Sequence, residues 1–79
     1  MNHNEITPSM RLASSLLQQR NQILKSSDWT QLPDSPLSDE EKTQWAAYRQ
    51  AWRDITRQSG FPDEVVIPMP PNWVAPQQP

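Results

Sequence analysis

Apolar residues recur at helical spacing in two stretches of the chain, and a polar segment rich in turn-forming residues separates them. In the first stretch they lie three, four or seven positions apart: Met10, Ala13, Leu16, Leu17, Ile23 and Leu24. This spacing predicts an amphipathic helix. Thr7 can act as its N-cap and Pro8 fits its first position, where a missing N–H costs nothing. We therefore predict a flexible N-terminus over residues 1–6 and a helix over about residues 8–25.

Arg20 interrupts the apolar stripe of this first helix, because at 100° per residue it projects into the middle of the stripe. In one interpretation, its aliphatic stem covers apolar surface and its charged head stays in water. In the other, the guanidinium binds a carboxylate, and Asp28 and Asp34 are the local candidates.

A second helix is predicted over about residues 39–59. Ser38 and Glu41 form a capping-box pattern at its start. At its end, Gly60 can adopt a left-handed C-cap conformation and Pro62 prevents continuation. Its apolar stripe is largely aromatic and consists of Trp45, Tyr48, Trp52 and Ile55.

A basic ridge lies beside that stripe, because Arg49, Arg53 and Arg57 are four positions apart. The ridge is interpreted either as a solvated face or as a docking edge for acidic groups.

The segments around the two helices are rich in proline. Residues 26–38 contain Pro33 and Pro36 and predict an ordered connector. Residues 60–79 hold six prolines together with apolar residues, which predicts an extended or polyproline II arm. The fold is therefore predicted to be all-α, a two-helix hairpin over residues 7–59 with an extended, proline-rich C-terminal arm.

Composition limits the functions available to this chain. Its 79 residues contain no cysteine, which leaves neither disulfides nor thiolate zinc sites to stabilise a small core. The formal net charge of −2 argues against a nucleic-acid partner. No apolar run approaches the length of a membrane span, and the N-terminus lacks the features of a secretory signal. We expect a cytosolic protein with no nucleic-acid or membrane partner.

Catalytic and metal-binding patterns are also absent from the sequence. The single histidine, His3, lies in the N-terminus predicted to be flexible, and the single glycine, Gly60, excludes a glycine-rich phosphate loop. The carboxylates are explained by capping and turns. We therefore expect no enzyme activity, no metal and no cofactor. Tryptophan, methionine and arginine, in contrast, are the residue types enriched at protein interfaces.

The central segment of the sequence closely resembles the small phage tail assembly chaperone module. Residues 20–55 read RNQILKSSDWTQLPDSPLSDEEKTQWAAYRQAWRDI, and the family pattern combines an arginine, DWTQ-P-D-PLS and W-x-x-YRQ-x-LRD. The matching connector positions are Arg20, Asp28, Trp29, Thr30, Gln31, Pro33, Asp34, Pro36 and Leu37. Those of the second helix are Trp45, Tyr48, Arg49, Gln50, Arg53 and Asp54, and Trp52 stands where the pattern has leucine. In the arm, Ile67 stands where a tryptophan is common.

The resemblance implies a protein that helps assemble the phage tail by binding a tail, baseplate or tail-fibre protein in the host cytoplasm. One alternative is a minor structural subunit retained in the virion tail, and another is an inhibitor of a host protein. We expect the connector motif to be structural, with Trp29 covering a core of Leu24, Trp45 and Tyr48. The candidates for partner binding are Phe61, Val66, Ile67, Met69, Trp73 and Val74. The sequence leaves open whether the hairpin closes on itself or pairs in a homo-oligomer.

Overall fold

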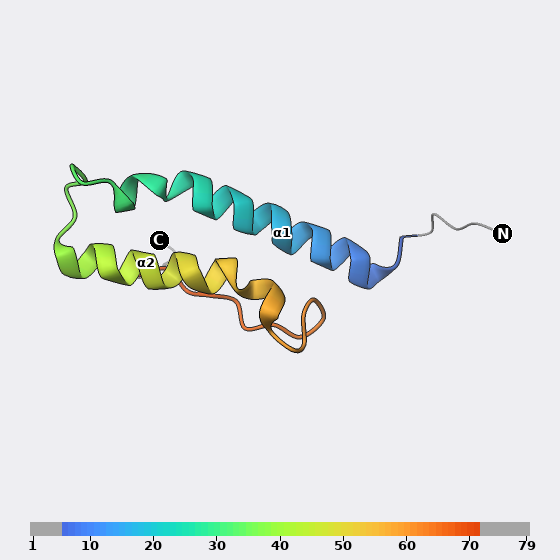
Figure 1. Ribbon diagram of the computed structural model, residues 1–79. Coiled ribbons are helices and arrows are strands. Elements are labelled where there is room, and N and C mark those ends of the chain that lie inside the picture. The colour runs from blue at the N-terminus through green and yellow to red at the C-terminus, as the bar shows by residue number, and fades with distance from the viewer. Residues whose placement is uncertain (1–5, 72–79) are drawn as a thin grey trace, which may run out of the picture.

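The chain folds as two antiparallel helices that lie side by side (Figure 1). This computed structural model describes residues 6–71. His3, Trp73 and Val74 lie outside this range, as does most of the N-terminus predicted to be flexible. The helices are α1 (Pro8–Ser26) and α2 (Asp39–Arg53), and each is followed by a short 3₁₀ turn, η1 (Asp28–Gln31) or η2 (Ile55–Arg57). Residues 6–71 contain no strand, which confirms the all-α hairpin.

Local capping determines where both helices begin. The Thr7 side chain accepts a hydrogen bond of 3.1 Å from the Met10 N–H, and Pro8 occupies the first turn of α1 as predicted. At α2, the Ser38 hydroxyl accepts from the Glu41 N–H at 3.1 Å, while the Glu41 carboxylate accepts from the Ser38 N–H at 3.0 Å. Each pair satisfies backbone donors that the helix itself leaves without partners.

The capping box makes stability depend on pH. Hydrogen bonds from the Ser38 backbone and hydroxyl lower the pKa of Glu41 below its ordinary value of 4.5. A lowered pKa stabilises the fold above the pKa of the unfolded chain, and this contribution is lost as the pH falls through the folded-state pKa. We expect the free energy of unfolding to fall less in Glu41→Gln than in the native chain between about pH 6 and about pH 3. Urea titrations followed by circular dichroism measure this difference. Glu40→Gln removes the same charge from an exposed neighbour and serves as the matched control. Identical profiles for the two variants would contradict the assignment.

Helix α2 ends at Arg53, earlier than its predicted end near residue 59. The chain turns at Asp54 and continues as η2, in which Ile55 is completely buried. The prediction of a left-handed C-cap at Gly60 is wrong, because no described glycine has a positive φ. Gly60 is instead required by a close approach, since a Cβ atom there would lie 2.9 Å from the Glu64 Cβ and closer still to the Glu64 carbonyl oxygen.

The core between the helices is small. Within residues 6–71, the buried apolar side chains are Leu16, Trp52 and Ile55, with exposed fractions of 5%, 1% and 0%. Trp45 and Tyr48 are half-buried and make an edge-to-face contact, with ring centroids 5.6 Å apart. A hairpin with so few buried apolar residues has little reserve of stability, so polar contacts that hold its parts together matter more than usual.

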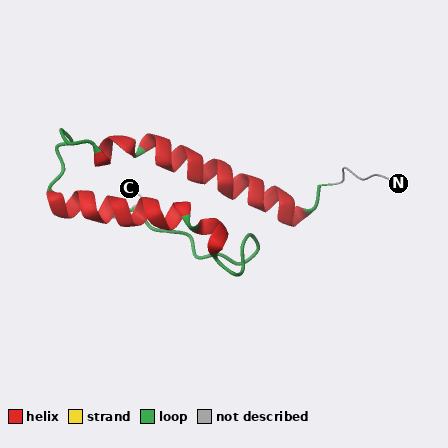
Figure 2. Cartoon of the chain, viewed as in Figure 1, coloured by secondary structure: helices red, strands yellow, loops and turns green. Residues whose placement is uncertain are grey.

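The segment after η2 turns back and runs along α2, on the side away from α1 (Figures 1 and 2). The turn includes a cis Phe61–Pro62 peptide bond. The Gln58 side chain then holds the returning chain, accepting from the Val66 N–H at 2.8 Å and donating to the Val66 carbonyl at 3.0 Å. Ser9 of α1 donates to the Asp63 carboxylate at 2.8 Å, so this turn also touches the start of α1.

Neither helix within residues 6–71 is both long enough and apolar enough to cross a membrane.

Candidate functional site

The connector turn η1 distributes its side chains over three faces. In a 3₁₀ turn, residues three positions apart share a face. Asp28 and Gln31 form one such pair, and both bind groups of α2. Thr30 faces inward and is completely buried. Trp29 and Leu32 form the outer pair, with exposed fractions of 47% and 50%.

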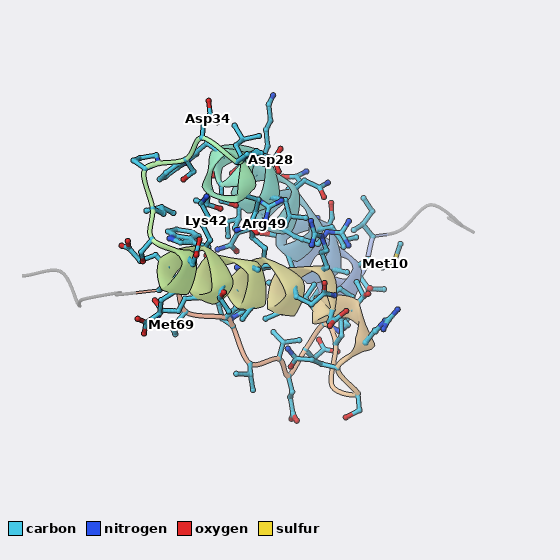
Figure 3. All side chains as sticks on the ribbon, turned by 60° about the vertical axis from the view of Figure 1, so that its left-hand side comes forward. Met10, Asp28, Asp34, Lys42, Arg49 and Met69 are labelled. Atoms are coloured by element: carbon cyan, nitrogen blue, oxygen red, sulfur yellow. The ribbon has the colours of Figure 1, made fainter. Side chains whose placement is uncertain are left out.

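Arg49 of α2 is the centre of the polar contacts at this closed end of the hairpin. Its Nη1 donates to the Leu24 carbonyl at 2.7 Å and to the Ser27 hydroxyl at 2.6 Å. Its Nη2 donates to the Asp28 carboxylate at 2.7 Å. Figure 3 shows Arg49 and Asp28 between α2 and the end of α1. We call the residues Leu24, Ser27, Asp28 and Arg49 the clasp.

The clasp provides a hydrogen-bond donor for a carbonyl group at the C-terminus of α1. The last carbonyls of a helix have no partner inside it and carry the negative end of its dipole. Arg49 brings a hydrogen-bond donor and a positive charge to that end, although it belongs to the other helix. The planar guanidinium carries donors on separate nitrogens in a fixed fork, so Nη1 reaches a carbonyl and a hydroxyl while Nη2 reaches a carboxylate. A lysine has all its donors on a single nitrogen. One side chain therefore ties α1, the connector and α2 together.

These contacts correct two expectations about the arginines. Arg49 is only 5% exposed, so it is neither part of a solvated ridge nor a docking edge, unlike the exposed Arg53 and Arg57. Of the two interpretations of Arg20, the one with a carboxylate partner is wrong for the described residues, since the Arg20 Nε donates to the Asn21 side chain at 3.2 Å. Asp28 binds Arg49 instead, because it is Arg49 that reaches the connector from across the hairpin.

Further hydrogen bonds hold the connector to itself and to α2. The Thr30 hydroxyl donates to the Ser27 carbonyl at 2.6 Å, inside the fold. The Gln31 amide donates to the Lys42 carbonyl at 3.2 Å, and the Lys42 ammonium donates back to the Pro33 carbonyl at 3.4 Å. Sequence reasoning missed the roles of Ser27 and Lys42. Ser27 directly follows the end of α1, and that position is the one signal of its role.

Trp29 is about half exposed, while Thr30 takes the completely buried position of the turn, so the expected contact of Trp29 with the core stays a prediction. The predicted companions Leu24, Trp45 and Tyr48 are half-buried. The remaining apolar surface of the described residues lies elsewhere: Ile6, Met10 and Leu12 at the start of α1, and Val66, Ile67 and Met69 in the arm.

Two open depressions border these surfaces. One, of about 450 Å³, lies on the first half of α1 and is lined by Ile6, Met10, Arg11, Ser14, Ser15 and Gln18. The other, of about 440 Å³, lies between α2 and the arm and is lined by Gln44, Ala47, Tyr48, Ala51, Pro68, Met69 and Pro71. Figure 3 places Met69 on the side of α2 opposite Asp28, and Met10 near the far end of α1.

The other motif residues lie outside the clasp. Asp34, at the outer turn of the connector (Figure 3), is exposed, as are Pro33 and Pro36, while Leu37 is half-buried. Gln50 donates to Asp54 at 3.1 Å within α2, and Arg57 forms an exposed ion pair with Asp54 at 3.9 Å. Among the partner-binding candidates, Phe61 is half-buried. The structure therefore brings part of the connector motif together with Arg49 and leaves the arm candidates on a separate side of α2.

The arrangement holds the chain together and presents exposed apolar side chains. Across residues 6–71, no three histidine, cysteine, aspartate or glutamate side chains come close enough together to hold a metal ion. The exposed apolar side chains can be buried against another molecule.

Comparison with known proteins identifies one family. The family model described as phage tail assembly chaperone protein matches residues 13–72, which include both helices and the connector motif. No curated protein and no solved structure gives a significant match.

Proposed function

Because the chain belongs to the phage tail assembly chaperone family, and so has a role in tail assembly, we propose that it acts without catalysis by binding a tail, baseplate or tail-fibre protein through exposed apolar side chains. This proposal is supported by the number of exposed large apolar side chains, which exceeds the number of buried ones. In residues 6–71, three apolar side chains are buried, whereas eight large ones are exposed. Single exposed apolar residues are ordinary, but this excess over the core is not.

Binding would protect an unassembled tail protein from premature association. Each Å² of apolar surface covered contributes roughly 25 cal/mol, so a modest interface on the client can suppress its self-association. The exposed side chains of the arm, Val66, Ile67 and Met69, belong to this binding surface in the proposal. In this proposal, the step takes place in the infected host cytoplasm.

Purification of the tagged full chain from infected cells tests the proposal. We expect a tail, baseplate or tail-fibre protein to co-purify in near-stoichiometric amount. The combined variant Val66→Ser, Ile67→Ser, Met69→Ser should lose most of that protein while it keeps its helical circular dichroism, because these side chains are exposed. A change at two exposed polar positions of α1, Gln19 and Gln22 to alanine, serves as the control. Recovery of host proteins alone would contradict the proposal and favour a host-directed inhibitor.

Quantitative mass spectrometry of purified virions then shows whether the protein leaves the tail before the virion is complete. Abundance in the lysate and absence from particles is the result expected of an assembly factor. A stoichiometric signal in the particle would instead make the protein a subunit retained in the tail.

A further inference from the structure

We propose that the outer face of η1, formed by Trp29 and Leu32, is the anchor that docks on the assembly partner, and that the partner offers an apolar pocket bordered by lysine or arginine. This inference rests on the proposed function and specifies the site and the chemistry of its partner. We call Trp29 and Leu32 the anchor face.

The anchor face is held rigidly although it is exposed. The other two faces of the turn are bound by the fold, through Asp28 to Arg49 and through Gln31 to the Lys42 carbonyl. The buried Thr30 hydroxyl fixes the turn from inside. A rigid side chain loses little conformational entropy on binding, which is the main cost that preorganisation removes. Tryptophan is also the residue type most enriched among binding hot spots.

The packing of the hairpin does not require Trp29 and Leu32 to be exposed. Trp52 and Ile55 are completely or almost completely buried, whereas Trp29 and Leu32 keep 47% and 50% of their surface exposed. The exposed half of this apolar pair becomes buried only against another molecule.

Charge around the anchor face indicates what that molecule is like. Residues 28–41 contain five carboxylates, Asp28, Asp34, Asp39, Glu40 and Glu41. Two cations reach this segment, Arg49 at Asp28 and Lys42 at the Pro33 carbonyl, so the carboxylates remain in excess. The Asp28 side chain is 66% exposed although one of its oxygens binds Arg49, so it still presents negative charge to the surface. A complementary partner carries cations around its pocket. A second copy docking through the same face would set carboxylates against carboxylates, which disfavours self-association there.

Photo-crosslinking in infected cells tests the inference. The crosslinking amino acid p-benzoylphenylalanine replaces Leu32 in the full chain, and separate variants carry it at Val66 in the arm or at Gln19 on the exposed side of α1. We expect the Leu32 probe to crosslink a phage tail protein at a segment that contains lysine or arginine, well above the Gln19 background. Crosslinks from Leu32 to a second copy alone, to an uncharged or acidic segment, or at background level would overturn the inference. If Val66 reaches a tail protein while Leu32 does not, the anchor is wrong and the proposed function stands. If neither probe reaches one, both fail.

Binding measurements on the crosslinked tail protein provide the second test. Trp29→Ala should weaken binding about 30-fold, as expected for a hot-spot tryptophan. Gln19→Ala should leave binding unchanged. The native affinity should also fall as salt rises, because surface charge pairs are screened. A change of less than about twofold for Trp29→Ala, with its circular dichroism unchanged, would overturn the inference.

Discussion

Replacement of Arg49 by alanine should cost about 3 to 5 kcal/mol of the free energy of unfolding and leave much of the protein unfolded. Hydrogen bonds to charged groups contribute about 1.5 to 3 kcal/mol each, and neutral ones less. Arg49 donates to three acceptors from an almost completely buried position. Domains of this size have roughly 4 to 12 kcal/mol of total stability, so the loss is a large fraction. Urea denaturation followed by circular dichroism measures it.

Two further variants show which part of the clasp matters. Asp28→Asn should cost only about 1 kcal/mol, because the Asp28 side chain is 66% exposed and Arg49 keeps its bonds to Leu24 and Ser27. Arg49→Lys should not restore stability, since a single ammonium cannot match the fork of a guanidinium. Equal losses for Asp28→Asn and Arg49→Ala would mean that the ion pair, and not the capping of α1, carries the effect.

Replacement of Trp52 by alanine should cost about 3 to 5 kcal/mol, as is usual for a buried aromatic side chain. Trp52 is 1% exposed and is the largest side chain in the core. Its indole Nε1 is buried and has no hydrogen-bond partner among residues 6–71. A buried donor without a partner costs about 1 to 3 kcal/mol, so Trp52→Phe removes that penalty while it keeps most of the apolar volume.

We therefore expect Trp52→Phe to lose less than about 1.5 kcal/mol, well below the loss for Trp52→Ala. Thermal and urea denaturation of the two variants make the comparison, and Trp45→Phe, at a half-buried position, serves as the control. A loss in Trp52→Phe as large as that in Trp52→Ala would show that the indole N–H is used in the native protein.

The family motif divides into two functions when it is placed on the structure. Asp28, Thr30, Gln31 and Arg49 fasten the connector between the helices. Trp29 lies in the same short turn but faces outward. The same run of residues thus holds the fold and presents the anchor face, which is efficient in a protein with so small a core. The predicted arm residues Val66, Ile67 and Met69 remain a second candidate surface.

Local interactions were predictable from the sequence alone. The starts of α1 and α2 depend on contacts between residues three positions apart, at Thr7 and at Ser38 with Glu41. The periodicity of the apolar residues likewise reports on a single helix at a time. The sequence alone therefore predicted the all-α hairpin, the first helix and the family.

Contacts between residues far apart in the sequence were determined only by the tertiary structure. Sequence spacing could not tell which arginine would meet Asp28, because that depends on how the two helices are rotated against each other. The contacts of Arg49 span 21 to 25 residues of sequence. The packing of the helices also buries Trp52 of the apolar stripe of α2, while Trp29 of the connector stays 47% exposed. The residue at which a helix begins is determined by contacts within one helical turn. Which side chains are buried and which stay exposed is determined only when the two helices pack together.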